Sequence, residues 1–132
     1  MVQISKGFRQ LVDEAEERVE TLDVEAARRA IDAGGVLVVD LRDVRELQRE
    51  GKIPGAMHVP RGMLEFWVDP ASPYHKQELA DAPRLLLYCG SGWRSALAAR
   101  TLQEMGAEGV SHLGGGFAAW KQAGGAIEEV RR

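Results

Sequence analysis

The order of apolar and polar positions predicts helices at the start of the chain. Near the N-terminus, apolar residues recur at steps of three and four, the period of an amphipathic helix. These positions are Ile4, Phe8, Leu11, Val12, Ala15 and Val19. The next segment, "DVEAARRAIDAGG", predicts a short second helix with a cap near Thr21 or Asp23 and an end at Gly34 and Gly35.

Short apolar runs predict the strands. They are "VLVVDL" at 36–41, "LLLYC" at 85–89 and "GVSHL" at 109–113. The first two are continuous apolar runs, which is typical of strands buried on both faces. The segment "KIPGAMHVP" predicts a turn and a short strand that reaches Val59, and "AIEEV" predicts an edge strand near the C-terminus.

Helical segments alternate with these strands. The segments are "DVRELQREG", ended by Gly51; "RSALAARTLQEMG", ended by Gly106; and "GGGFAAWKQAGG", a loop followed by a short helix. Residues 61–84 contain three prolines and no sustained period, so we expect a surface excursion there. The alternation of short buried strands with helices favours an α/β sandwich with a mostly parallel sheet.

Composition and charge exclude several classes of protein. The 132 residues suit one domain, and the net charge of −3 with scattered arginines predicts binding to neither nucleic acid nor a membrane surface. A single cysteine cannot form an internal disulfide. The first residues lack the apolar core of a signal peptide, and the apolar runs are too short to span a bilayer. We therefore expect a cytoplasmic protein.

The only cysteine, Cys89, lies at the end of a predicted buried strand and just before a predicted helix. Ligands of open α/β sheets bind at the carboxyl ends of the strands. The free amides and the dipole of a helix N-terminus favour a thiolate there. An inert, buried cysteine is the alternative interpretation.

The residues after the cysteine indicate an anion-binding loop. Gly90 and Gly92 have no Cβ and can turn N–H groups inward through positive φ angles. Ser91 and Ser95 add hydroxyl donors, and Arg94 adds a permanent cation. A core cysteine needs no such neighbours, so the sequence favours a sulfur nucleophile. The hydrogen-bond donors around it would suit a sulfur anion or a small oxyanion.

Two other interpretations of this loop compete. "GSGWRS" is a weak match to the Gly-x-Gly-x-x-Gly dinucleotide fingerprint, and no acidic ribose ligand follows at a strand end. Cysteine phosphatases and arsenate reductases have loops that resemble Cys-x5-Arg, whereas this loop is Cys-x4-Arg. The shorter ring is better sized for one sulfur atom than for a tetrahedral oxyanion.

Three motifs together resemble the rhodanese (sulfurtransferase) family. "CGSGWRS" is similar to the family's Cys-x-x-Gly-x-Arg-Ser loop, "VVDLRDVRELQREGKIPGAMHVP" to its upstream signature, and "LGGGFAAWKQAG" to its C-terminal Gly-Gly-x-x-x-Trp signature. They occur in the family's order. The resemblance implies a three-layer α/β sandwich with a mostly parallel five-stranded sheet. The N-terminal helix predicted from the apolar period is an addition that the three motifs do not explain. We divide the chain into a helical extension at 1–20 and a rhodanese-like domain at 21–132.

The resemblance also implies an activity. Cys89 would take a sulfane sulfur from thiosulfate or a persulfide, hold it as a persulfide, and pass it to cyanide or a thiol, without a cofactor or metal. A protein donor or acceptor is compatible with this chemistry. A cysteine phosphatase or arsenate reductase and a non-catalytic sulfur-carrier or sensing module remain as alternatives. The N-terminal helix either packs on its own domain or joins two copies in a homodimer.

The site residues have expected roles within that family. The loop 90–95 would bind the substrate, with Trp93 on the wall or rim of the pocket or as an exposed anchor. Arg94 would either bind an anionic donor or turn back to an acid and brace the loop. The glycines at 114–116 are expected to bring the chain close to this loop.

Residues upstream of the loop are expected to support it. Asp40 and Arg42 end the first buried strand, and we expect Arg42 to be the one that faces the pocket. Glu46 would pair with Arg42 or lie exposed on its helix, and His58 is expected to be structural rather than an acid or base. The other two histidines, His75 and His112, do not form a metal-ligand spacing with Cys89.

Overall fold

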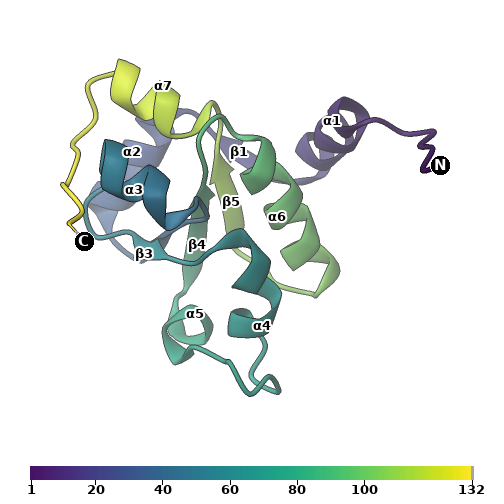
Figure 1. The fold of residues 1–132 in the computed structure, drawn as a ribbon. Coiled ribbons are helices and arrows are strands. Elements are labelled where there is room, and N and C mark those ends of the chain that lie inside the picture. The colour runs from purple at the N-terminus through teal and green to yellow at the C-terminus, as the bar shows by residue number, and fades with distance from the viewer. Residues whose placement is uncertain (132) are drawn as a thin grey trace.

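A sheet of five parallel strands forms the centre of the computed structural model, which describes residues 1–131 (Figure 1). The strand order is β1-β5-β4-β2-β3. The strands are β1 (Glu20–Leu22), β2 (Val36–Asp40), β3 (Met57–His58), β4 (Arg84–Tyr88) and β5 (Val110–Leu113). The predicted α/β sandwich is confirmed, and the sheet is parallel throughout.

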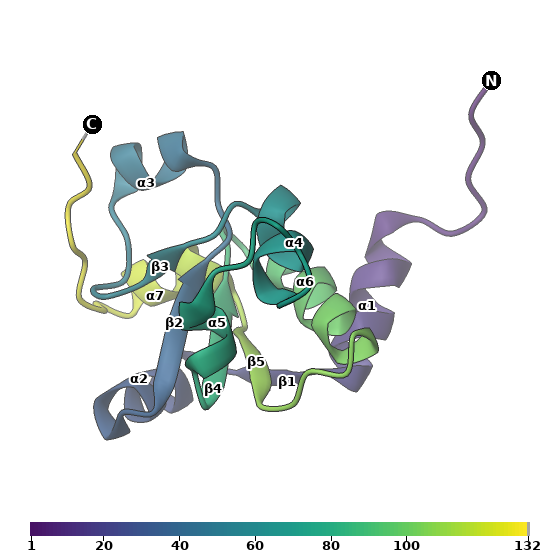
Figure 2. The same cartoon turned by 90° about the horizontal axis from the view of Figure 1, so that it is seen from below.

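Helices cover both faces of this sheet (Figures 1 and 2). They are α1 (Phe8–Arg18), α2 (Val24–Ala33), α3 (Val44–Glu50), the 3-10 turn η1 (Arg61–Met63), α4 (Leu64–Val68), α5 (Gln77–Asp81), α6 (Trp93–Glu104) and α7 (Gly116–Gln122). One face packs against α2 and α7, and the other packs against α4, α5 and α6. This gives the three layers that the sequence predicts.

The central strand β4 is apolar at successive positions because helices cover both of its faces. Leu86 and Tyr88 pack with α2 and α7, whereas Leu85 and Leu87 pack with the helices of the opposite face. All four side chains are buried. A strand covered on both faces has no polar side, so the period-two alternation of a half-exposed strand is absent.

Helix α1 forms a further layer outside α6 (Figure 1). Val12 and Ala15 pack against Ala96 of α6. The ring of Phe8 lies 4.9 Å from that of Trp93, and the Gln103 amide donates to the carbonyl oxygen of Arg18 at 2.7 Å. The two helices therefore run parallel, with both N-termini at the same end of the molecule.

The structure settles part of what was expected of this first helix. It begins at Phe8, so the prediction that Ile4 belongs to its apolar face is wrong, and Ile4 is 77% exposed. Packing of the helix on its own domain is confirmed. A homodimer through this helix stays a prediction. So does the division into 1–20 and 21–132, whose last residue lies outside the described residues.

Three other expectations need correction. The segment 126–130 is not an edge strand, because it makes only an isolated antiparallel bridge between Lys52 and Glu128. The fifth strand is β1, which the sequence reading missed. The segment 61–84, expected to be a surface excursion without regular structure, contains η1, α4 and α5. Among residues 1–131, no helix is long and apolar enough to cross a membrane.

Candidate active site

Cys89 directly follows β4, at the carboxyl edge of the sheet between β5 and β2. The chain then turns over Gly90 to Gly92 and enters α6 at Trp93. We call residues 89–95 the active loop. The cysteine side chain is 1% exposed, and it lies against the first turn of α6.

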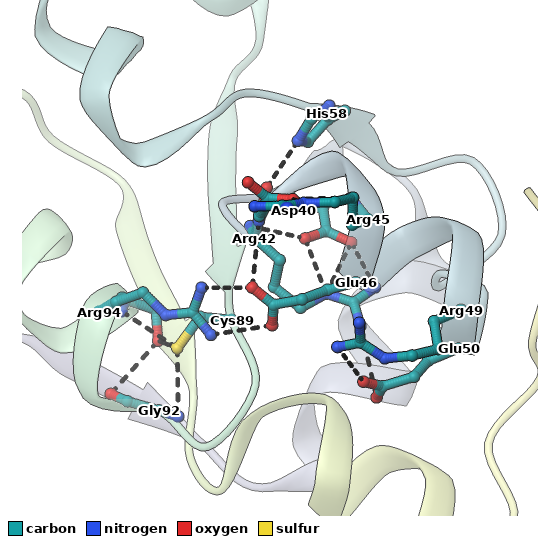
Figure 3. Close-up of polar contacts among 12 residues, drawn as sticks. Asp40, Arg42, Arg45, Glu46, Arg49, Glu50, His58, Cys89, Gly92 and Arg94 are labelled. Carbon is teal, nitrogen blue, oxygen red and sulfur yellow. Dashed lines mark hydrogen bonds and ion pairs between the residues drawn. The ribbon is translucent and has the colours of Figure 1, made fainter. Parts of the chain in front are cut away.

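The sulfur atom of Cys89 lies among hydrogen-bond donors of its own loop. The Cys89 thiol donates to the Ser95 hydroxyl oxygen at 3.6 Å. Its Sγ accepts from the backbone N–H of Gly92 at 3.2 Å (Figure 3) and from that of Ser95 at 3.4 Å. These donors come from the first turn of a twelve-residue helix, whose dipole also favours negative charge. The loop therefore surrounds the sulfur with positive partial charges.

The two loop glycines have different reasons to be glycine. Gly92 has a φ of +101°, and a Cβ on it would meet the backbone nitrogen of Gly115 at 3.2 Å. Gly90 lies outside the positive-φ region, so that part of the expectation is wrong. A Cβ on Gly90 would instead lie 3.1 Å from Nη2 of Arg94, so its small size leaves room for that guanidinium.

The start of α7 supports the active loop from the other side. The N–H of Phe117 donates to the carbonyl oxygen of Cys89 at 2.8 Å, and that of Ala118 donates to the carbonyl of Gly90 at 3.0 Å. A Cβ on Gly116 would lie 2.6 Å from both of these carbonyl oxygens. The expectation that the glycines at 114–116 bring the chain close to the loop is confirmed.

Arg94 forms a two-pronged ion pair with Glu46 of α3. Its Nη1 and Nη2 lie 2.9 and 3.1 Å from the two carboxylate oxygens (Figure 3). Hydrogen bonding to Arg94 is the main reason why the pKa of Glu46 is lowered, and the same hydrogen bond raises the pKa of Arg94. The expected pairing of Glu46 with Arg42 is wrong. Arg94 makes the bracing contact, and its binding of a donor stays a prediction.

Asp40 and Arg42 form a second pair, fully buried at the end of β2. Arg42 donates to both oxygens of Asp40 and to the carbonyl of Gly51, and its guanidinium lies 4.3 Å from the Phe117 ring centroid. The Tyr88 hydroxyl also donates to Asp40, and burial raises the pKa of Tyr88. Arg42 therefore lies in the core, and the expectation that it faces a pocket is wrong.

His58 links β3 to this buried pair. Its Nε2 donates to the carbonyl oxygen of Arg42 at 2.6 Å (Figure 3). This contact holds the turn that follows β2, which agrees with the structural role expected for this histidine.

Trp93 lies on the rim of the active loop and is 43% exposed. Its ring packs against Phe8 of α1, and the guanidinium of Arg9 lies 5.2 Å from its centroid. Ser91, at the tip of the loop, is exposed. The N-terminal end of α1 therefore lies beside the rim of the active loop.

His112 is the site residue that the sequence reading missed. Its Nδ1 lies 2.9 Å from the hydroxyl oxygen of Ser95, and its Nε2 lies 3.0 Å from that of Thr21. The side chain is fully buried, and burial lowers its pKa to about 4. The only sequence signal for His112 is its position near the end of β5. This signal becomes useful only when the strand order shows that β5 lies beside β4. Within residues 1–131, no group of three or more His, Cys, Asp or Glu could hold a metal ion.

Comparison with known proteins agrees with this geometry. A sulfurtransferase from Allochromatium vinosum is 32% identical over 107 residues, which cover 80% of this chain and 92% of that protein. A Bacillus subtilis protein named for sulfur carriage is 29% identical, and the match spans 49% of its length.

Solved structures extend the comparison. A Rhodopseudomonas palustris protein of unknown function, described as a possible tyrosine phosphatase, superposes with a TM-score of 0.91 and 48% identity over 97% of this chain and 99% of its own. Thiosulfate sulfurtransferase from Pseudomonas aeruginosa gives a TM-score of 0.75 and 30% identity, over 92% of this chain and 22% of that one. The sequence pattern of the rhodanese-like domain matches residues 23–123. The strand order, the cysteine loop and these matches together show that the chain belongs to the rhodanese-like family.

Proposed function

We propose that this protein is a sulfurtransferase that carries a sulfane sulfur as a persulfide on Cys89. The observation that carries the proposal is the position of Sγ at the start of α6, with the N–H groups of Gly92 and Ser95 at 3.2 and 3.4 Å. Amides so placed stabilise a thiolate before reaction and an anionic terminal sulfur after it.

The first half-reaction would load the cysteine. The Cys89 thiolate attacks the sulfane sulfur of thiosulfate or of a small persulfide, and a bond forms between Sγ and that sulfur. The sulfur–sulfur bond of the donor breaks, and sulfite or a thiolate leaves with the electron pair. The sulfur nucleophile needs no separate general base at this step once it is ionised.

The second half-reaction would unload it. Cyanide or an acceptor thiolate attacks the terminal sulfur, the persulfide bond breaks, and its electron pair returns to Sγ as a thiolate. The product is thiocyanate or a new persulfide. The two half-reactions form a ping-pong cycle in which the loop 90–95 holds the negative charge at both stages.

The intact mass of the protein after incubation with thiosulfate tests the proposal. We expect the wild type to gain one sulfur atom, cyanide to remove it, and the Cys89→Ser variant to gain none. Glutathione persulfide and a cysteine desulfurase with its substrate serve as further donors. Failure of all three donors to add sulfur to reduced, folded protein would overturn the proposal.

Phosphatase activity is a second candidate, because the Rhodopseudomonas structure that is 48% identical is described as a possible tyrosine phosphatase. Two observations argue against it. The loop places Arg94 one residue closer to Cys89 than in the Cys-x5-Arg loops, and Glu46 occupies both prongs of its guanidinium. Hydrolysis of an aryl phosphate by the wild type but not by Cys89→Ser would favour this candidate instead.

A sulfur carrier that depends on a protein partner is the third candidate, and the Bacillus relative is named for sulfur carriage. The exposed aromatic rim formed by Phe8 and Trp93 offers a contact surface beside the cysteine. Steady-state turnover of thiosulfate and cyanide distinguishes a free-standing enzyme from a carrier, which would load once and then stop without its acceptor.

A further inference from the structure

A chain of polar side chains connects the buried thiol of Cys89 to the edge of the sheet. The sulfur lies 3.6 Å from Oγ of Ser95, this oxygen lies 2.9 Å from Nδ1 of His112, and Nε2 of His112 lies 3.0 Å from Oγ1 of Thr21. The residues come from the end of β4, α6, β5 and β1, which the strand order brings together. No two of them are close in sequence except Cys89 and Ser95.

This series of polar side chains begins in the interior and ends at an exposed residue. Cys89 is 1% exposed, and Ser95 and His112 are fully buried. Thr21 is exposed, because β1 is an edge strand of the sheet. Thr21 also lies outside residues 23–123, the part of the chain that the family pattern matches. The path therefore leads from the buried nucleophile to an exposed residue of the edge strand β1.

Every link in this chain can reverse its direction. Hydroxyl groups both donate and accept, and a neutral imidazole carries its proton on either ring nitrogen. Burial lowers the pKa of His112 to about 4, so the ring is neutral near pH 7. The Ser95 hydroxyl has a second acceptor in the Gly92 carbonyl, but at 3.4 Å this contact is longer than the one to His112.

We propose that Cys89 exchanges its proton with solvent through Ser95, His112 and Thr21, with His112 changing tautomer as the thiol ionises. In the thiol form, S–H donates to Ser95, Ser95 donates to Nδ1 of His112, and Nε2–H donates to Thr21. In the thiolate form all three hydrogen bonds are reversed, so that the Ser95 hydroxyl donates to the anionic sulfur.

The protons balance at each step of this exchange. Sγ gives its proton to Ser95, Ser95 gives its own to Nδ1, Nε2 gives its proton to Thr21, and Thr21 releases its own to water. One proton leaves the protein, and the charge that appears is the thiolate. His112 stays neutral in both the thiol and the thiolate states, so no buried imidazolium has to form. It positions Ser95 and also relays the proton.

Charged side chains beside the active loop are paired with one another. Arg94 of α6 pairs with Glu46 of α3, and Arg42 pairs with Asp40 at the end of β2. Arg42 also faces Glu50 of α3 at 3.8 Å. The raised pKa of Arg94 is caused mainly by its hydrogen bond to Glu46. The polar side chains that include His112 reach the sulfur from β5, and none of their hydrogen bonds involves a residue of these ion pairs.

The proposal rests on Cys89 being the nucleophile of the proposed function, but it is tested without any sulfur donor. Nitrogen-15 NMR of histidine-labelled, reduced protein reports the tautomer of His112, assigned by its loss in His112→Asn. We expect the proton on Nε2 below the pH at which Cys89 ionises and on Nδ1 above it. In Ser95→Ala this dependence on Cys89 should vanish. One unchanged tautomer in the wild type, or a switch that survives in Ser95→Ala, would overturn the proposal.

A matched pair of variants tests the solvent end of the path. Thr21→Val removes the hydroxyl and keeps a β-branched residue in β1, whereas Thr21→Ser keeps the hydroxyl. We expect iodoacetamide to alkylate Cys89 about fivefold more slowly in Thr21→Val at neutral pH, the effect of one lost hydrogen bond. Thr21→Ser should react like the wild type. Equal rates in Thr21→Val and wild type, at unchanged thermal stability, would contradict an exit through Thr21.

Discussion

Both terminal nitrogens of Arg94 lie on the carboxylate of Glu46, at 2.9 and 3.1 Å, so the loop's permanent cation is already paired in the resting protein. The Arg94 side chain is 43% exposed and that of Glu46 is 22% exposed. An anionic donor that approaches Cys89 therefore has to compete with Glu46 for this guanidinium. Arg94 cannot brace the loop through Glu46 and bind a donor at the same moment, but the two roles can follow one another in the proposed cycle.

Neutralising Glu46 should release Arg94 for the donor. Glu46→Gln keeps the capping box of α3, because the glutamine oxygen can still accept from the Asp43 N–H. A part-exposed pair of this kind contributes about 1 kcal/mol, so we expect KM for thiosulfate to fall about fivefold. Steady-state kinetics measure this change.

Glu104→Gln is the matched control, since it breaks the pair between Glu104 and Arg100 in the last turns of α6, at the opposite end of that helix from the loop. It should leave KM for thiosulfate unchanged. An unchanged KM in Glu46→Gln as well would show that Arg94 does not reach the donor.

Adding one methyl group to Gly116 should displace the active loop. The Cβ would lie 2.6 Å from the carbonyl oxygens of Cys89 and Gly90, at a φ of +61°. Gly124→Ala is the control, because it has a φ of +78° and nothing within 4 Å of its Cβ. We expect backbone strain of about 1–2 kcal/mol in both variants. Gly116→Ala should lose roughly 1–3 kcal/mol more through overpacking, as well as most of its Cys89 alkylation rate.

Urea unfolding and iodoacetamide alkylation measure these two effects. Equal stability and equal alkylation in the two variants would mean that the contact between α7 and the loop does not hold Cys89 in place.

Breaking the buried pair at the end of β2 should be costly. Arg42→Met leaves the Asp40 carboxylate buried without its cation, which is expected to lower the free energy of unfolding by about 3–5 kcal/mol. Combining it with Asp40→Asn removes the uncompensated charge, so the double variant should be more stable than the sum of the two changes by about 2 kcal/mol.

An exposed pair provides the comparison. Arg45 and Asp43 are joined by an ion pair at 3.1 Å with side chains 82% and 50% exposed. Arg45→Met should change the unfolding free energy by less than about 0.5 kcal/mol. A similar small effect in Arg42→Met would contradict a structural role for the buried pair.

The stability of the protein should fall as the pH falls from about 6.5 towards 4. The pKa of His112 is lowered by burial from 6.5 to about 4, so the unfolded chain takes up this proton first. Protonation therefore favours the unfolded state across that interval, at a cost on the order of 3 kcal/mol by pH 4. Urea unfolding at several pH values measures the slope.

His112→Asn should flatten the slope between these pH values, whatever its effect on stability at neutral pH. The other two histidines are present in both proteins, so the difference in slope belongs to His112. Equal slopes in the two proteins would mean that His112 takes up its proton at the same pH in the folded and unfolded states.

Local features of the fold could be predicted because their signals lie within a few residues. The buried strands show as continuous apolar runs, and the ends of α3 and α6 follow from Gly51 and Gly106. In contrast, β1 has three residues, of which one is apolar, and it pairs only because β5 offers a free edge. The helices α4 and α5 have five residues each, too few for a helical period to show.

The errors at the candidate site come from contacts that only the fold brings together. Arg42 and Glu46 are four residues apart, which predicts a pair when both lie on one helix. Arg42 precedes α3, which begins at Val44, so the rule does not apply and its side chain enters the core. His112 meets Ser95 across 17 positions of sequence and Thr21 across 91. Neither contact has a sequence signature.

The parallel packing of α1 on α6 has a practical consequence for anything joined to the chain's first residue. Because Phe8 meets Trp93, the segment before Phe8 leaves the molecule at the same end as the active loop. An affinity tag or fused partner attached at Met1 would be tethered at the end of the molecule that carries the active loop, at a high effective concentration. In the proposed reaction its own thiols would compete as sulfur acceptors, so an untagged or cysteine-free fusion is the appropriate material for assays.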